Sequence, residues 1–261
     1  MRYPRPLLAP GLLLLILFIV SGLVWPSYQI SHRRFTYVLV HGAYGGGWNW
    51  RQVDDLLSAD GQKVFRPTLT GQGQEYHLAG PDVNLNTHIQ DIVNTILFED
   101  LHDVVLVGHS YGGMVVTGVA DRIPDRIKCI IYLDAILPED GESVDTAAGG
   151  VLHDPTKEKF DAQGSLIPTW LDPKKPLPHD EPEPGNAFHQ PISLTNQKIA
   201  RAIPSTYVLF VAKGTELEKA RFHAFYLRAI ARGWPVLTFE SDHNAQWSHP
   251  RELAELLEKL P

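Results

Sequence analysis

The sequence predicts an α/β fold: about six mostly parallel strands form a sheet flanked by helices, with a small inserted cap. Short apolar runs rich in β-branched residues alternate along the chain with longer segments whose apolar residues recur at helical spacing. One apolar run ends in Gly-x-Ser-x-Gly at 108–112 and continues into a small-residue helix pattern, which is typical of a sharp strand–turn–helix unit. The length of 261 residues fits one sizeable core and is too short for two large domains.

The first half of the chain alternates between strand and helix patterns. Phe35–Val40 is almost wholly apolar and predicts a strand. Trp48–Ala59 places its large apolar residues on one side of a helix, and Leu85–Glu99 repeats isoleucine and valine at helical spacing. The elements expected here are strands at 35–40, 62–66 and 104–107 and helices at 48–59, 85–99 and 111–122.

The second half resumes the alternation after a long interruption. Ile127–Leu133 is an apolar run that follows the small-residue helix and predicts the next strand. The remaining elements expected are strands at 207–212 and 236–239 and helices at 217–232 and 250–260.

The interruption covers about residues 137–203 and is rich in proline, above all between Pro168 and Pro191. An insertion of this length inside a compact domain is usually a functional lid or cap. Its charged tip, Lys174–Gly185, predicts a solvated, partly extended loop. The domain from 35 to 261 is therefore expected to carry a cap at 137–203.

Residues 1–34 form a segment of a different kind. No charged residue occurs from Pro6 to Ser31, and Arg2 and Arg5 precede the unbroken apolar run Leu12–Val20. This pattern fits a secretory signal peptide. It also fits an uncleaved signal anchor, about long enough to cross a ~30 Å hydrocarbon core, and we favour the anchor over cleavage. The sequence therefore predicts a membrane-anchored or exported protein, with membrane contact through this segment and the remaining domain outside the cytoplasm.

Composition restricts the partners. The formal net charge is −7 and the isoelectric point is about 5.9, which argues against nucleic acid as the main partner. Cys129 is the single cysteine and lies in an apolar run, so we expect a buried structural thiol. No Cys/His cluster has the spacing of a zinc site, and we predict neither a metal nor a cofactor. The expected partner is a small molecule, and the oligomeric state is left open.

Ser110, at the centre of the Gly-x-Ser-x-Gly pattern, is the predicted nucleophile. A serine raised on a sharp turn has a strained backbone, so the residues two positions before and after it must be small, as Gly108 and Gly112 are. The helix that follows directs N–H groups toward developing negative charge. A chance match in a loop is the alternative, and the adjoining strand and helix patterns disfavour it.

A serine hydroxyl also needs a general base and an acid that orients the base. His243 is the predicted base, because it follows the last strand and would lie over the carboxyl edge of the sheet beside Ser110. Two residues compete for the acid. Asp134 ends the strand after the nucleophile helix, where a carboxylate among apolar residues needs a partner such as an imidazolium. Glu216 follows the penultimate strand but fits equally well as a first-turn helix carboxylate, so we favour Asp134.

Backbone donors and pocket residues complete the expected site. The N–H of Tyr111, directly after the nucleophile, and that of Ala43, in the glycine-rich turn after the first strand, are the predicted oxyanion donors. Aromatic side chains that could form an apolar pocket come from that turn, the cap and the last loop; ordinary packing is the alternative for each. The predicted substrate-binding residues are Tyr44, Trp170, Phe188 and Trp247.

Five motifs together resemble those of the α/β-hydrolase superfamily. They are Val38–Ala43 with Trp48, Leu69–Gly73, Gly108–Gly113, Tyr132–Ala135 with Pro138–Gly141, and Asp242-His243. The chain is most similar to the branch of small esterases that contains plant methyl-ester esterases, hydroxynitrile lyases and their bacterial relatives. The resemblance covers about residues 35–135 and 205–260. It implies a sheet that lacks the first two strands of the full superfamily and carries a small cap.

Two departures from that branch refine the expected activity. Plant members keep an Asp after the penultimate strand, where this chain has Lys213-Gly214-Thr215; other superfamily members place the acid one strand earlier, as Asp134 would be. Hydroxynitrile lyases have a Thr where Gly42 stands and, where Asn244 stands, a Lys whose charge stabilises departing cyanide. The expectation is therefore a serine esterase that cleaves small to medium, largely apolar esters or lactones through an acyl-enzyme. A lyase or C–C bond hydrolase of the same fold, and a non-catalytic small-ligand receptor, are the alternatives.

Overall fold

The computed structural model describes residues 33–150 and 158–261. The predicted signal or anchor segment, residues 1–34, lies outside the described residues except for its last two positions. Within the described ranges, no helix is long and apolar enough to cross a membrane. The described residues belong to one compact unit that begins at residue 32.

Six strands form one sheet in the order β2-β1-β3-β4-β7-β8, and every neighbouring pair is parallel. The strands are β1 (Thr36–Val40), β2 (Lys63–Phe65), β3 (Val104–His109), β4 (Ile127–Leu133), β7 (Ser205–Val211) and β8 (Val236–Glu240). The central strand β3 is buried along its whole length, which explains why it is an apolar run and does not alternate. The predicted sheet of about six mostly parallel strands is confirmed.

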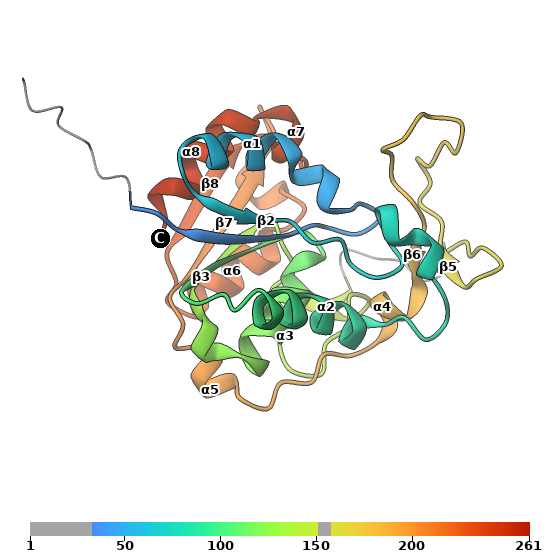
Figure 1. The fold of residues 1–261 in the computed structure, drawn as a ribbon, viewed down its shortest axis with the longest axis horizontal. Coiled ribbons are helices and arrows are strands. Elements are labelled where there is room, and N and C mark those ends of the chain that lie inside the picture. The colour runs from blue at the N-terminus through green and yellow to red at the C-terminus, as the bar shows by residue number, and fades with distance from the viewer. Residues whose placement is uncertain (1–32, 151–157) are drawn as a thin grey trace, which may run out of the picture. The chain divides into compact units, whose positions relative to one another are not determined.

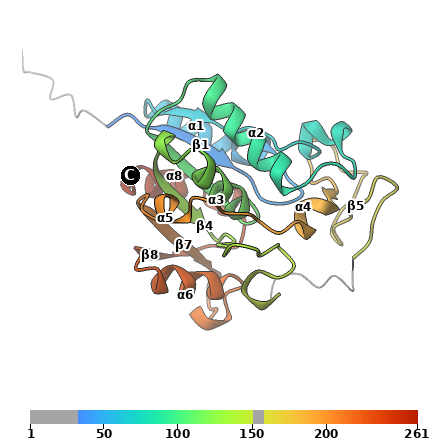
Figure 2. The ribbon, with the colours of Figure 1, turned by 90° about the horizontal axis from the view of Figure 1, so that it is seen from below.

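Helices cover both faces of this sheet. One apolar core lies under α1 (Arg51–Ala59), α7 (Ala245–Ser248) and α8 (Pro250–Lys259). The other lies under α2 (Leu85–Phe98), α3 (Gly112–Arg122) and α6 (His223–Ala231). Figure 1 shows α1 beside α8, and Figure 2 shows α2 beside α3. A sheet with both faces covered is the expected arrangement for parallel strands.

Local sequence explains where α2 begins, whereas the predicted start of α6 was wrong. Asn84 caps α2 through a reciprocal pair of hydrogen bonds with Thr87, so the helix begins where the sequence predicts. The predicted helix at 217–232 does not form between residues 217 and 222. Leu217–Lys219 is a separate 3-10 turn, and Ala220 has extended backbone (ψ 136°), so α6 begins only at His223. Cys129 is buried as expected, and burial raises the pKa of its thiol to about 11.

The cap segment, residues 137–203, connects β4 to β7. Its described part contains β5 (Ser165–Leu166) paired antiparallel with β6 (Glu183–Pro184), followed by α4 (Gly185–His189) and α5 (Gln197–Ala200). Figures 1 and 2 both show β5 and α4 gathered beyond one end of the sheet. The prediction that Lys174–Gly185 is a solvated loop holds for 174–178 and is wrong for Glu183–Gly185, which is buried. Hydrogen bonds from the core to the Glu183 carboxylate hold that part inward.

Candidate active site

Ser110 occupies the sharp turn between β3 and α3. Its φ of +54° lies in the left-handed region, where a residue other than glycine is strained. The Ser110 N–H donates to the Leu133 carbonyl at 3.2 Å, which ties the turn to the end of β4. A Cβ on Gly112 would lie 2.8 Å from the Val40 carbonyl oxygen, so only glycine fits beside β1. The small residue expected at this position is therefore required by a close backbone approach.

Three side chains form a continuous hydrogen-bonded chain at the carboxyl edge of the sheet. His243 Nε2 lies 2.9 Å from Ser110 Oγ, and His243 Nδ1 lies 2.6 Å from Asp134 Oδ2. An ionised carboxylate can only accept a hydrogen bond, so the proton of the neutral imidazole belongs on Nδ1. Nε2 is then the acceptor that faces the serine hydroxyl. This arrangement has the geometry of a nucleophile, a general base and an acid that orients the base.

Asp134 and Glu216, the two residues considered for the acid, lie in contrasting environments. Asp134 is 4% exposed at the end of β4, and its second oxygen accepts the Phe210 N–H at 3.2 Å. Glu216 has a side chain that is 69% exposed and forms an ion pair with Lys219 at 2.7 Å. The structure brings Asp134, and not Glu216, to the imidazole of His243.

The predicted oxyanion donors lie beside Ser110. Ala43 and Tyr111 both line the cavity at the serine, and neither backbone N–H has an acceptor among residues 33–150 and 158–261. His41 supports the turn after β1: its Nε2 accepts the Leu69 N–H, and its Nδ1 donates to the Gly42 carbonyl at 2.7 Å. Burial lowers the pKa of His41 to about 4, so this imidazole is neutral near pH 7. The turn is thus positioned by a buried, uncharged histidine.

Two residues around His243 were not predicted as part of the site. His109 directly precedes Ser110, and its Nε2 bonds the backbone carbonyl of His243 at 2.7 Å. Burial lowers the pKa of His109 well below its usual value, so the ring is neutral and Nε2 can donate this bond. Phe222 stacks on the His243 ring with centroids 4.9 Å apart and planes within 7°. No sequence signal singles out Phe222, because it is one aromatic residue just before a helix.

A cavity of about 620 Å³ opens over Ser110 and His243. All four predicted substrate-binding residues, Tyr44, Trp170, Phe188 and Trp247, line it. The Tyr44 ring makes edge contacts with Trp170 at 5.3 Å and with Phe188 at 6.0 Å between centroids. Aromatic side chains of the core and of the cap segment therefore pack together along one side of the cavity above Ser110.

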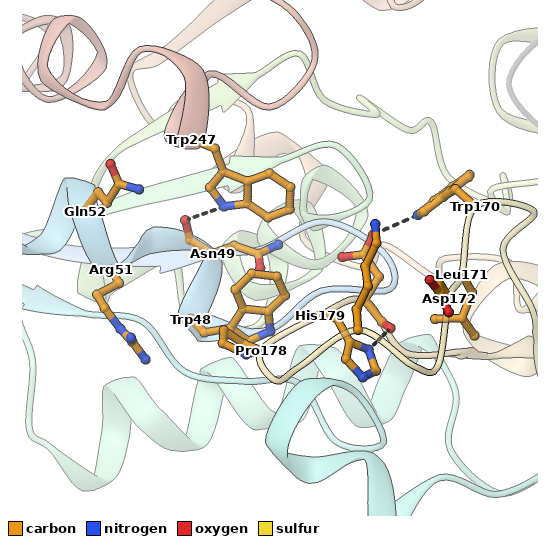
Figure 3. Close-up of a pocket in the computed structure, with 12 residues that line it drawn as sticks. Trp48, Asn49, Arg51, Gln52, Trp170, Leu171, Asp172, Pro178, His179 and Trp247 are labelled. Atoms are coloured by element: carbon orange, nitrogen blue, oxygen red, sulfur yellow. Dashed lines mark hydrogen bonds between the residues drawn. The ribbon is translucent and has the colours of Figure 1, made fainter.

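A neighbouring pocket of about 430 Å³ shares Trp170 and Trp247 with this cavity. Trp48 lines only the second pocket and stacks on Trp247, with ring centroids 5.4 Å apart and planes within 18°. Figure 3 shows this tryptophan pair on the core side, with Trp170 and Leu171 of the cap segment opposite. The two spaces together offer aromatic surface that extends away from Ser110.

One group of side chains among the described residues has metal-ligand spacing, and it lies elsewhere. Atoms of Asp145, Glu158 and His189 are all within 4.8 Å of one another. The two ring nitrogens of His189 already face carboxylates, Asp145 at 2.8 Å and Glu158 at 3.8 Å. None of the three residues lines the cavity at Ser110. This group therefore has the arrangement of a histidine held between two carboxylates in the cap segment.

The sheet order, the serine turn and the chain from Ser110 to Asp134 define a hydrolase-type site on an α/β scaffold. The alpha/beta hydrolase family model matches residues 37–256, and the chain belongs to this family. It is 38% identical over 242 residues to a carbendazim-hydrolysing esterase from Nocardioides sp. (strain SG-4G), covering 86% of this chain and 98% of that protein. It is 29% identical over 252 residues to a pFDCC methylesterase from Arabidopsis thaliana, covering 83% and 90%.

Solved structures agree with this assignment. An extracellular alpha/beta-hydrolase from a Paenibacillus species has a TM-score of 0.70 at 23% identity and covers 87% of this chain and 98% of its own. At that identity the likeness concerns the fold. The expected membership in the α/β-hydrolase superfamily, in its branch of small esterases, is confirmed.

Proposed function

We propose that this protein is a serine esterase that hydrolyses carboxylic esters through an acyl-enzyme. The hydrogen-bonded chain from Ser110 Oγ through His243 to Asp134 carries the proposal. The relatives support it, because one hydrolyses carbendazim and another is a methylesterase. In the proposed role of Asp134, its carboxylate holds the imidazole in the tautomer that accepts a proton at Nε2.

The proposed reaction has two halves. Ser110 Oγ attacks the ester carbonyl carbon while His243 Nε2 takes its proton, and the Ala43 and Tyr111 N–H groups receive the oxyanion. The carbon–oxygen bond to the alcohol then breaks, and the imidazolium returns the proton to the leaving oxygen. Water attacks the acyl-enzyme by the same route, which releases the carboxylic acid and restores the serine.

Hydrolysis of p-nitrophenyl esters by the full chain tests this proposal. We expect turnover by the native protein and a loss of about 10⁴-fold or more in the variant Ser110→Ala, since removing a member of such a triad leaves only the contribution of binding and the oxyanion donors. Absence of turnover with short acyl esters would contradict it. Binding without turnover would then favour a receptor, and release of cyanide from a cyanohydrin would favour a lyase.

We propose an ester with an aromatic group as the substrate class. Two contiguous aromatic spaces at Ser110, with the stacked Trp48–Trp247 pair at the far end, support this choice. Trp48→Ala should raise KM for a naphthyl ester about tenfold and leave an ethyl ester unaffected. Gln52→Ala removes a side chain that lines the same pocket without a ring and serves as the control. Equal effects of Trp48→Ala on both esters would refute an aromatic subsite.

We also propose that residues 1–34 bring the protein to a membrane or export it. The uncharged stretch from Pro6 to Ser31 after two arginines supports this. Fractionation of expressing cells with N-terminal sequencing tests it. Intact protein in the membrane fraction favours an anchor, and mature protein that starts near Leu23 in the exported soluble fraction favours a cleaved signal. Intact protein in the soluble cytoplasmic fraction would refute both.

A further inference from the structure

Tyr44 directly follows the proposed oxyanion donor Ala43, and its backbone is bound to the cap segment on both sides. The Tyr44 N–H donates to Glu183 Oε2 at 2.9 Å, and the Tyr44 carbonyl accepts the Glu181 N–H at 2.8 Å. The φ of Tyr44 is +65°, a conformation that a residue other than glycine keeps only when its surroundings hold it. The cap segment thus holds the strained residue of the loop that carries Ala43.

Burying the carboxyl group of Glu183 at this position costs free energy. Its side chain is 0% exposed, and its second oxygen accepts the Gln72 Nε2–H at 2.8 Å. No arginine, lysine or histidine among the described residues forms an ion pair with it. The titratable groups that face it are Tyr44 and Tyr111, both uncharged near pH 7 because burial raises the pKa of each phenol. A buried carboxyl without a cationic partner adds little to stability. The role of Glu183 is therefore better explained by the groups that it hydrogen-bonds.

We propose that Glu183 is a positioning residue for the oxyanion hole. Its carboxyl fixes the peptide between Ala43 and Tyr44, and so holds the loop in the shape that presents the Ala43 N–H to the reacting carbonyl oxygen. The inference rests on the proposed esterase function. It makes the cap segment part of the catalytic support as well as a cover, because Glu183 belongs to β6 and the Ala43 loop follows β1.

The proposal predicts a specific kinetic effect. Without the Glu183 acceptor, the buried Tyr44 N–H has no partner and the strained loop can relax. Oxyanion contacts act mainly in the transition state, so their loss lowers kcat more than it changes KM. We expect Glu183→Ala to lower kcat about tenfold to hundredfold, with KM within about threefold, since removing a whole oxyanion donor costs about 10²–10³.

The carboxyl also predicts a pH signature. Burial raises the pKa of Glu183 to about 8, so the neutral form accepts the Tyr44 N–H at pH 7. Above pH 8 the carboxyl ionises without a cationic partner, and we expect the cap contact to loosen and kcat to fall. Glu183→Gln keeps a carbonyl acceptor and cannot ionise. This variant should therefore retain kcat within about threefold at pH 7 and lose the fall above pH 8.

The experiment compares the full chain with Glu183→Ala, Glu183→Gln and the control Glu181→Gln, using p-nitrophenyl ester kinetics from pH 6 to pH 10. Glu181 lies on the same segment and bonds Tyr44 only through its backbone, so its side-chain variant should keep the native pH profile. The inhibition constant of a boronic acid, whose tetrahedral adduct mimics the oxyanion, should rise with the loss of kcat in Glu183→Ala. A variant that only loosened the fold would not weaken this inhibitor in step with kcat.

The outcomes separate the two proposals. If the native protein does not hydrolyse esters, the proposed function fails. If it does, native kcat in Glu183→Ala or a native alkaline fall in Glu183→Gln overturns the role of Glu183. If Glu183→Ala does not fold, the pH profile of Glu183→Gln decides alone.

Discussion

Replacement of Glu183 by glutamine should stabilise the protein, and more so as the pH rises. The folded pKa of Glu183 is about 8, whereas the unfolded carboxyl titrates near its ordinary 4.5. Between these values the folded state keeps a proton that the unfolded state has lost, so stability falls as pH rises. At about 1.4 kcal/mol per pH unit, the native protein loses roughly 5 kcal/mol of stability between pH 4.5 and pH 8 through this group, and the loss stays constant above pH 8. Below pH 4.5 both states are protonated, and the effect vanishes.

Urea unfolding of the native chain and of Glu183→Gln at pH 4.5, 6.5 and 8 measures this effect. Glutamine has nearly the same shape as the neutral acid and keeps the acceptor for Tyr44, so the two proteins should unfold with similar free energies at pH 4.5. By pH 8, the free energy of unfolding of the variant should exceed that of the native protein by roughly 5 kcal/mol. Taking the difference removes the contributions of other titrating groups, which both proteins share. A difference that does not change with pH would refute the reasoning.

Three further predictions follow from particular residues. Asp134→Asn should lower kcat/KM about 10⁴-fold through loss of the correct imidazole tautomer, while Glu216→Gln stays near native in the same ester assay; the reverse pattern would assign the acid to Glu216. His41 should titrate near pH 4 by NMR, so that stability is lost at about 1.4 kcal/mol per unit as pH falls from 6.5 toward 4; a midpoint near 6.5 would contradict its burial. Gly47→Ala would overlap a backbone carbonyl and should lower the melting temperature by several degrees, whereas Gly80→Ala meets open space; equal melting would refute the close packing.

Much of the architecture was predictable because its signals are local. All six strands lie where the sequence predicts them, to within two residues at each end, and the Gly-x-Ser-x-Gly turn marks the position of Ser110. The errors arose where long-range contacts override composition. The charged, proline-rich stretch 174–185 suggested a solvated loop, but Glu183 near its end is buried because the core donates two hydrogen bonds to it. Composition cannot reveal a partner that lies 139 residues away in the chain, as Tyr44 does.

The sequence by itself determined the family and the sharp turn at Ser110, since both depend on motifs of neighbouring residues. The sequence favoured Asp134 over Glu216 as the acid, but only the tertiary structure shows which carboxylate meets the imidazole, because Asp134 and His243 are 109 residues apart. The parallel sheet brings the ends of β4 and β8 to one edge, and the hydrogen bond between Nδ1 and the carboxylate follows from that. The stacking of Phe222 on His243 and the hydrogen bond from the Tyr44 N–H to Glu183 also join residues far apart in the sequence, so only the folded structure shows them.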